Sequence, residues 1–230
     1  MSNHIVVLTG AGISAESGIP TFRDSGGLWE DHDIESVATP EGWARNPERV
    51  LKFYNARRRQ LKTVTPNAAH QALVELESRY RVDVITQNVD DLHERAGSTN
   101  VMHLHGELTK VRSERFPDLV YSCHEDINMG DQCEKGHQLR PHVVWFGEDV
   151  PMLEPAAQLT EVADIILVIG SSMQVYPAAG LVSFAREDAS VFYVDQFPTL
   201  NYELQKLRNL TIVNDRATVG VPQVVSQLLS

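Results

Sequence analysis

Polar side chains that could bind or activate a substrate follow three expected strands of this 230-residue chain. The first strand leads into Gly10-Ala-Gly12, where two glycines let the backbone approach a phosphate group. The second leads into Gln87-Asn-Val-Asp90, which supplies two amides and a carboxylate at a strand end. The third leads into His105, whose imidazole can exchange a proton near neutral pH. These residue types suit the binding of a pyrophosphate group beside amide, carboxylate and imidazole side chains.

Each of these signals also has a simpler structural interpretation. The glycine loop fits a dinucleotide-binding fingerprint only loosely, because Ala15 occupies the third glycine position. No second strand ends in an acidic residue about twenty positions later, where a ribose-binding carboxylate would normally stand. A tight turn between strand and helix would also explain Gly10 and Gly12, and a lone His105 could be a hydrogen-bonded core residue.

The elements that must position these residues alternate between strands and helices. We expect strands at residues 5–8, 82–86, 101–104, 165–169, 191–194 and 210–213, and helices at 47–61, 66–78, 178–186 and 219–229. This alternation predicts an α/β fold, with a Rossmann-like parallel sheet and helices on both faces. We expect a single domain over residues 1–230 with a large lobe formed by residues 1–33, 81–109 and 141–230. Two insertions would form a smaller lobe, one helical at residues 34–80 and one irregular at residues 110–140.

Composition limits the classes of function. Hydrophobic residues make up 42% of the chain, enough to bury a core without disulfide or metal support. With 20 Lys and Arg against 31 Asp and Glu, the formal net charge is −11, which disfavours binding to nucleic acid. Two cysteines exclude a disulfide framework and a four-cysteine zinc site. We expect a cytoplasmic protein without a signal peptide, a membrane span or a membrane partner.

Four motifs in a fixed order point to one protein family. They are Gly10-Ala-Gly-Ile-Ser14 with the later Thr21-Phe-Arg23, Gln87-Asn-Val-Asp90, His105-Gly-Glu107 and Val144-Trp-Phe-Gly-Glu148. Their order and spacing resemble those of the sirtuins, the NAD-dependent protein-lysine deacylases. The resemblance extends over residues 5–229 and is weakest over residues 110–140.

The resemblance implies a reaction that breaks the nicotinamide–ribose bond of NAD and lets the acyl-lysine carbonyl oxygen attack the ribose carbon. It implies His105 as the general base, with Asn88 and Asp90 as the other catalytic residues. In this sequence Asp195 replaces the Asn that the family usually has near the adenosine ribose. The implied NAD-binding residues are Gly10, Ala11, Gly12, Ser14, Ala15, Thr21, Phe22, Arg23, Trp29, Gln87, Asn88, Val89, Asp90, Gly170, Ser171, Ser172, Asp195 and Ala217.

A Tyr-x-x-Arg pair predicts the acyl group. Tyr54 and Arg57 stand three residues apart on an expected helix and therefore share a face. Similar pairs in class III sirtuins bind a carboxylate at the end of the acyl chain, and a guanidinium and a phenol suit that task. Alternatively, Arg57 begins a solvated basic run that continues through Arg59, and Tyr54 is a core residue.

A short apolar run is the candidate binding segment for the substrate peptide. We expect it to be extended, so that its backbone pairs with the backbone of the peptide. An ordinary edge strand would have the same pattern. The residues concerned are Val143, Val144, Trp145, Phe146 and Gly147.

The zinc ribbon that most sirtuins carry is degenerate in this sequence. No cysteine stands near residues 110–113, and Gly136 replaces the partner of Cys133. The remaining donors could form a rearranged zinc site from Cys123, His124, Cys133 and His137. We expect instead that zinc is not bound and that the module is closed by packing of Leu119, Val120, Tyr121 and Leu139.

The expected function is therefore the NAD-dependent removal of succinyl, malonyl and also acetyl groups from protein lysines. Nicotinamide and O-acyl-ADP-ribose would be the products, and we expect a monomer that acts on acyl-lysine proteins or peptides. Two alternatives stay open. The chain could be an NAD-dependent protein ADP-ribosyltransferase, or a non-catalytic module that senses NAD.

Overall fold

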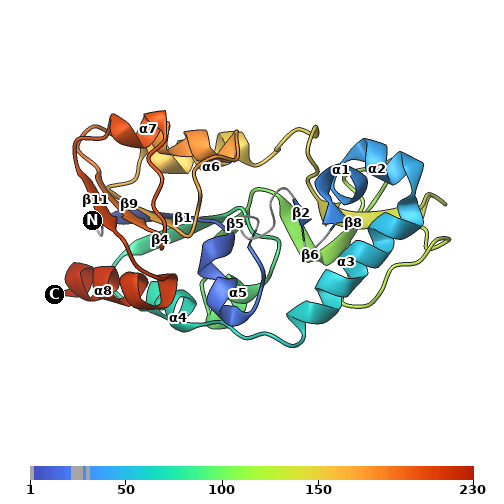
Figure 1. Ribbon diagram of the computed structural model, residues 1–230, viewed down its shortest axis with the longest axis horizontal. Helices are drawn as coiled ribbons and strands as arrows, with labels where there is room; N and C mark the ends of the chain where they lie inside the picture. The colour runs from blue at the N-terminus through green and yellow to red at the C-terminus, as the bar shows by residue number, and fades with distance from the viewer. Residues whose placement is uncertain (1–2, 22–27, 30–31) are drawn as a thin grey trace.

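The larger part of the molecule is a six-stranded parallel sheet (Figure 1). The computed structural model describes residues 3–21, 28–29 and 32–230. The strand order is β11–β10–β9–β1–β4–β5. The strands are β1 (His4–Thr9), β4 (Arg81–Thr86), β5 (Val101–His103), β9 (Ile165–Ile169), β10 (Ser190–Val194) and β11 (Leu210–Val213). Strand β1 lies near the centre, with Val7 in register with Val84 on one side and Leu167 on the other.

Both faces of this sheet are apolar at its centre, because strands such as β1 and β9 are buried on both sides. Alternate residues such as Ile5 and Val7 pack against α4 (Ala68–Leu76) and α8 (Ala217–Leu229) on one face. Val6 and Leu8 face α6 (Leu153–Glu161), η4 (Ala178–Phe184) and α7 (Tyr202–Gln205) on the other. The two layers of helices are visible below and above the sheet in Figure 1. The expected Rossmann-like fold is confirmed, although the helix expected at residues 178–186 is a 3-10 helix.

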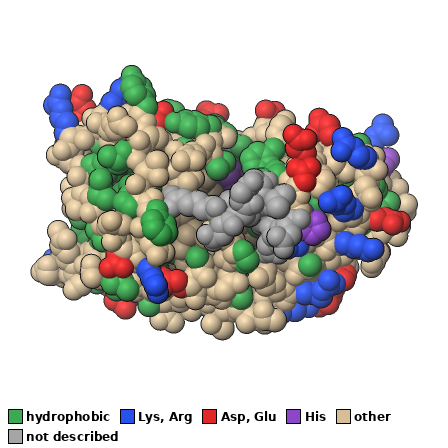
Figure 2. All heavy atoms as spheres, in the orientation of Figure 1, with side chains coloured by type: hydrophobic (Ala, Val, Ile, Leu, Met, Phe, Trp, Pro, Cys, Tyr) green, Lys and Arg blue, Asp and Glu red, His purple; other side chains and the backbone are tan. Residues whose placement is uncertain are grey.

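A second group of elements lies at the opposite end from β11 (Figure 1). It contains α1 (Ile34–Val37), α2 (Pro40–Arg45), α3 (Pro47–Leu61) and the antiparallel sheet β7 (Val120–Ser122)–β6 (Gly106–Ser113)–β8 (Leu139–Val143). Pro47 starts α3 where its missing N–H costs nothing, and the Asn46 side chain accepts from the Arg49 N–H. On the face shown in Figure 2, Lys and Arg side chains gather mainly towards this end. We propose that this group is the smaller of two lobes.

The segment expected to be irregular at residues 110–140 contains most of that antiparallel sheet, so the expectation of a loop is wrong. Strand β6 begins earlier, at Gly106, and a register shift interrupts its pairing with β8 between Glu107 and Val111. Its buried positions include Gly106 and Ser113, so the strand lacks the apolar alternation that would reveal it in the sequence.

The packing expected to close this module is partly wrong. Val120 is 38% exposed, whereas Val111 and Ile127 form the buried cluster with Leu51. Tyr121 and Leu139 pack against that cluster as expected.

The remaining elements are short. They are η1 (Ala11–Ile13), η2 (Ala15–Ser17), β2 (Leu28–Trp29), β3 (His32–Asp33) and α5 (Leu92–Ala96). None of the helices formed by residues 3–21, 28–29 and 32–230 combines the length and the apolar character needed to cross a membrane.

Candidate active site

A cavity of about 410 Å³ lies where the loops at the carboxyl ends of β1, β4, β9 and β10 meet α3 and the end of β8. This is the edge of a parallel sheet where ligands usually bind in α/β proteins. Most residues predicted for the site line it: Gly10, Ala11, Gly12, Ser14, Ala15, Thr21, Tyr54, Arg57, Gln87, Asn88, Val89, Asp90, His105, Val143, Val144, Trp145, Phe146, Gly147, Gly170, Ser171, Ser172, Asp195 and Ala217.

Three predicted residues cannot be located in this cavity. Phe22 and Arg23 lie outside the described residues. The backbone of Trp29 belongs to β2 and pairs with His32, and its side chain lies outside the described part of the structure.

The glycine loop after β1 packs directly on the loop after β9. The Gly12 N–H donates to the Gly170 carbonyl at 2.8 Å, and the Gly10 N–H donates to the Ile169 carbonyl at 3.0 Å. A Cβ atom on Gly12 would lie 2.6 Å from the Gly170 Cα, a distance that a real Cβ does not tolerate. Glycine is therefore required for the contact between these two loops.

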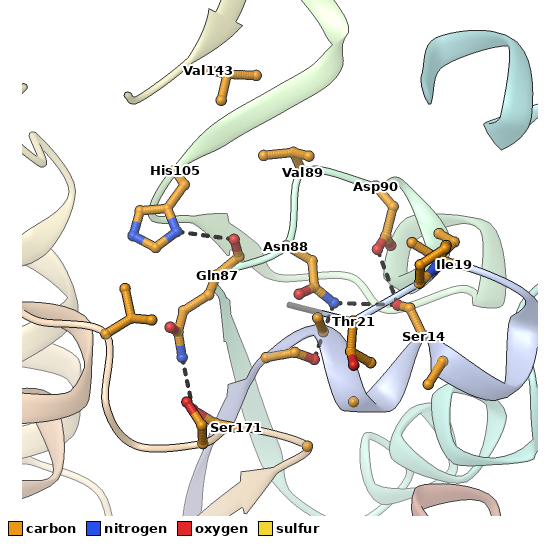
Figure 3. Close-up of a pocket in the computed structure, with 18 of the residues that line it drawn as sticks. Ser14, Ile19, Thr21, Gln87, Asn88, Val89, Asp90, His105, Val143 and Ser171 are labelled. Carbon is orange, nitrogen blue, oxygen red and sulfur yellow. Dashed lines mark hydrogen bonds between the residues drawn. The ribbon is translucent and has the colours of Figure 1, made fainter. Parts of the chain in front are cut away.

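A buried hydrogen-bond network connects this loop to the residues that follow β4 (Figure 3). The Ser14 hydroxyl donates to Asp90 Oδ2 at 3.0 Å. Asn88 Nδ2 donates to the Gly10 carbonyl and to Ser14 Oγ, both at 3.2 Å. Burial raises the pKa of Asp90, while hydrogen bonds from the Leu92 N–H and Ser14 oppose that rise. The network holds the Asn88 amide and the Asp90 carboxyl group in fixed orientations beside the cavity.

His105 carries its reactive nitrogen in a defined state. Its Nδ1 lies 3.0 Å from the Gln87 carbonyl oxygen, which can only accept, so Nδ1 is the protonated nitrogen of the neutral ring. The lone pair is therefore on Nε2. Burial lowers the pKa of His105, and its hydrogen bond to Gln87 opposes this. The Gln87 side chain in turn donates to Ser171 Oγ at 3.2 Å (Figure 3). A neutral imidazole in this setting can accept a proton.

His103 is a polar residue near the cavity that the sequence analysis did not single out. Its Nδ1 lies 3.0 Å from the Asn88 carbonyl oxygen and its Nε2 lies 2.7 Å from Glu94 Oε1. Burial lowers the pKa of His103. The hydrogen bond to Glu94 and the charge of Glu94 raise the pKa by more than burial lowers it, so the net shift is upwards. Two acceptors on one ring favour the doubly protonated form. The only sequence signal for His103 is its position two residues before His105.

Tyr54 and Arg57 lie on α3 at the other end of the cavity. Tyr54 is fully buried, and burial raises the pKa of its hydroxyl, so the phenol keeps its proton at neutral pH. The Arg57 guanidinium lies 3.9 Å from the Phe53 ring centroid and donates to the Phe53 carbonyl at 2.8 Å. Burial lowers the pKa of Arg57 to about 10, which leaves the group charged at neutral pH. The alternative interpretation of Arg57 as part of a solvated basic run is therefore wrong, because its guanidinium packs on Phe53.

The expectation of an extended segment over residues 143–147 is wrong at its end, where the chain turns. Strand β8 ends at Val143, and Phe146 and Gly147 form a turn. The Val144 N–H donates to the His105 carbonyl, and the Phe146 N–H donates to the Ala38 carbonyl. The Trp145 N–H donates to Glu148 Oε2 at 2.8 Å. These three donors are already paired within the chain, so they are not available to a peptide backbone.

Several cavity residues were missed by the sequence analysis. Glu148 was part of a quoted motif but had no assigned role, and it accepts hydrogen bonds from three residues. A second group forms the rim near β9 and β10 and consists of Val175, Tyr176, Phe197 and Arg216. Phe197 is 67% exposed, and an aromatic residue directly after a polar strand end is the only sequence signal that could have suggested it.

The four donors of a rearranged zinc site do not come together. Cys123 Sγ donates to the Glu125 carbonyl at 3.2 Å, and Cys133 Sγ donates to Ser113 Oγ at 3.4 Å. Among the residues that the structure describes, no three His, Cys, Asp or Glu side chains are arranged to hold a metal ion.

The residues of the cavity fit a dinucleotide. A glycine loop at a strand end can approach a pyrophosphate, and the hydroxyls of Ser14 and Ser171 and the carboxylate of Asp195 can bind ribose hydroxyls. The buried Asn88 amide suits a carboxamide. The same cavity thus combines dinucleotide-binding groups with a neutral imidazole.

Comparisons with known proteins agree with this site. Residues 10–177 match the model of the Sir2 family. A protein of Helicobacter pylori (strain J99) named NAD-dependent protein deacylase is 53% identical over 226 residues, which cover 98% of this chain and 95% of that protein. A protein of the same name from Aggregatibacter actinomycetemcomitans is 58% identical over 197 residues, which cover 86% of this chain and 95% of that protein.

A solved structure is also similar. The crystal structure of a Sir2 homolog in complex with NAD has a TM-score of 0.87 and 39% identity, and it covers 99% of this chain and 90% of that chain. The chain therefore belongs to the Sir2 family, and the resemblance to sirtuins is confirmed.

Proposed function

We propose that this chain removes acyl groups from protein lysine side chains with NAD as co-substrate and favours acyl chains that end in a carboxylate. One observation carries the proposal: a single cavity is lined by the dinucleotide-binding loop, by His105 and by the Tyr54–Arg57 pair. Dinucleotide-binding groups alone would fit many enzymes. The half-buried Arg57 guanidinium in the same cavity also suits an anionic acyl chain.

At the dinucleotide end, the roles follow from the hydrogen bonds. NAD, when bound, supplies a ribose whose bond to nicotinamide can break. Gly10 and Gly12 admit its pyrophosphate, and Asn88 and Asp90 hold the carboxamide and the ribose. His105 removes a proton from a ribose hydroxyl through Nε2, because Nδ1 is engaged with Gln87. A well-placed general base contributes about 10²–10⁴-fold to a rate.

At the acyl end, Arg57 and Tyr54 bind the carboxylate of succinyl- or malonyl-lysine. Stacking on Phe53 removes water from one face of the Arg57 guanidinium, and a partly desolvated charge pairs more strongly with an anion. An acetyl group is neutral and shorter, so it gains nothing from this pair. Acetyl-lysine is therefore a weaker substrate that still reacts.

We further propose that acyl-lysine proteins or peptides enter beside Val143, Val144 and Gly147, which line the cavity. Because three backbone donors of this segment are engaged, side chains and remaining carbonyl groups would make the contacts. The acidic net charge of −11 supports the absence of nucleic-acid partners. A cytoplasmic monomer without a membrane partner is part of the same proposal.

Mass spectrometry of a succinyl-lysine peptide incubated with the purified protein tests the activity. Loss of the succinyl mass only when NAD is present, with release of nicotinamide, is the expected result. Transfer of ADP-ribose to protein without loss of the acyl group would replace the proposal by an ADP-ribosyltransferase. NAD binding with no change in either mass would leave a sensing module.

The variant Arg57→Met tests the acyl preference. We expect kcat/KM for succinyl-lysine peptide to fall about 10–100-fold, which corresponds to the loss of a charge-assisted hydrogen bond, while acetyl-lysine changes by less than about threefold. Arg59→Met is the matched control, because Arg59 lies two residues away, 59% exposed, and pairs with Asp126 on the surface. Equal losses with both peptides would contradict the role of Arg57.

A further inference from the structure

Trp145 lies inside the molecule, next to Tyr54, which lines the acyl end of the cavity. Its side chain is 2% exposed, and its indole Nε1–H donates to the Tyr54 hydroxyl oxygen at 3.0 Å. The two ring centroids are 6.4 Å apart with an interplanar angle of 33°. Trp145 thus contacts Tyr54 through both its ring and its single polar atom.

A charged cluster fixes Trp145 itself. Glu148 accepts from the Trp145 backbone N–H at 2.8 Å and binds the Arg140 guanidinium through both carboxylate oxygens, at 2.6 and 3.1 Å. Arg112 Nη2 lies 3.1 and 3.2 Å from the same two oxygens. The guanidinium carbon of Arg140 lies 3.2 Å from the Trp145 ring centroid. Backbone and ring of Trp145 are therefore held by one ion-paired cluster.

This arrangement determines the orientation of the Tyr54 hydroxyl group. The indole N–H can only donate, so it occupies an acceptor site of the hydroxyl oxygen and fixes that oxygen in the cavity wall. Preorganised groups bind a ligand more tightly because less freedom is lost on binding. Tyr54 and Arg57 lie one turn apart on α3, so an oriented hydroxyl presents a fixed pair of groups to a carboxylate.

We propose that Trp145 is a positioning residue for acyl selectivity, whose indole N–H, held by the Glu148–Arg140 pair, orients the Tyr54 hydroxyl towards the carboxylate of the acyl chain. The proposal rests on the proposed function. It adds that selectivity for acidic acyl groups depends on a residue that acts through Tyr54.

The variant Trp145→Phe tests this role because it keeps an aromatic ring and removes the N–H. We expect KM for succinyl-lysine peptide to rise about five- to tenfold, as loss of one buried hydrogen bond predicts, with kcat and the acetyl-lysine KM within twofold of wild type. Calorimetric titration of each peptide into the NAD-free protein should show the same selective loss of affinity. A uniform loss on both peptides would contradict the proposal.

Trp43→Phe is the matched control. The Trp43 ring lies 5.8 Å from the Trp145 ring, but its indole N–H points to Glu114 at 3.4 Å and not to Tyr54. We expect its ratio of succinyl to acetyl activity to equal that of wild type. If Trp43→Phe changed that ratio as much as Trp145→Phe does, the effect would come from general packing. The proposed role of the hydrogen bond would then be overturned.

A double-mutant cycle separates positioning from structure. Tyr54→Phe removes the hydroxyl itself, so adding Trp145→Phe to it should not change the ratio of succinyl to acetyl activity any further. Additive losses would show that Trp145 acts independently of Tyr54 and would overturn the proposal. Failure of the proposed function is distinct, because wild type would then remove no acyl group, or would show no preference for succinyl-lysine.

Discussion

The pKa values of the two histidines that flank Leu104 shift in opposite directions, because their neighbours differ. His105 has one acceptor, the Gln87 carbonyl, and burial lowers its pKa. Burial also lowers the pKa of His103, but Glu94 more than reverses that effect. The His105 ring is therefore suited to accept a proton. The His103 ring, with its raised pKa, is suited to donate to the Asn88 carbonyl.

The fall of kcat/KM at acidic pH should reflect protonation of His105. Because the base must be neutral and burial lowers its pKa, we expect kcat/KM with acetyl-lysine peptide to fall only below pH of about 6.5, the ordinary value for histidine. Steady-state rates between pH 5 and 8 measure this. His105→Ala should lower kcat at least about 100-fold, while circular dichroism shows that the protein stays folded. A midpoint above 6.5 would be inconsistent with a desolvated base.

The protonation of His103 should depend on Glu94. In the variant Glu94→Gln the carboxylate charge is lost, so the pKa of His103 should be lower than in wild type. NMR titration of the imidazole resonances measures the difference. An unchanged His103 titration would show that the charge of Glu94 does not set its protonation state.

At the scale of elements, the site depends on two loops that touch through their backbones. Gly12 and Gly170 pack without side chains between them, which brings the ends of β1 and β9 to one wall of the cavity. Gly106 plays a similar part after His105, since its φ of +79° suits glycine and a Cβ there would lie 2.0 Å from the His142 carbonyl oxygen.

Gly12→Ala should destabilise the protein as well as impair NAD binding. Forcing a methyl group against the Gly170 backbone costs about 1–3 kcal/mol, so the melting temperature should fall by about 3–10 °C. Gly180→Ala is the control, because a Cβ there would meet the Tyr176 ring at an ordinary 3.8 Å. Thermal unfolding followed by circular dichroism compares the two variants. A melting temperature for Gly12→Ala equal to that of the control would mean that the loops can separate without cost.

Sequence reasoning succeeded where the signal was local. The apolar runs of β1, β4 and β9 and the Pro47 start of α3 are short-range patterns, and the sequence analysis predicted them. Trp145 was predicted as a site residue, but its hydrogen bond to Tyr54 could not be predicted, because it joins two residues that are far apart in the sequence. Strand β6 was hidden because glycine and serine occupy buried positions. Neither feature leaves a local apolar pattern in the sequence.

At the scale of the whole molecule, two buried histidines connect the helices beneath the sheet. His70 on α4 and His93 on α5 are almost fully buried, with ring centroids 4.9 Å apart. His93 Nε2 lies 3.1 Å from the Thr9 hydroxyl at the end of β1. Burial lowers the pKa of His70 to about 4 and that of His93 well below its ordinary value. Both rings are neutral in the folded protein.

Folding stability should therefore fall on mild acidification. The unfolded chain binds protons at these histidines near pH 6.5, whereas folded His70 resists protonation until about pH 4. The stabilisation is complete above pH 6.5 and is lost as the pH falls towards 4, at up to about 1.4 kcal/mol per pH unit for each such histidine. Urea unfolding between pH 7 and 4.5 measures it.

The variant His70→Met should lose less stability over that range, because one of the contributing groups is absent. Part of the slope should remain, since His93 and also His105 and His142 have lowered pKa values. An identical slope in wild type and variant would remove His70 from the explanation.

The position of β1 between β4 and β9 has a consequence for synthesis of the chain. β1 can pair with β4 early, but its other edge stays open until β9 is made about 80 residues later, several seconds at common translation rates. During that time an apolar strand edge is exposed, which is the kind of surface that chaperones bind and that aggregates recruit. The cavity is complete only after Ala217 has emerged, so the nascent chain gains its site only once the start of α8 has been made.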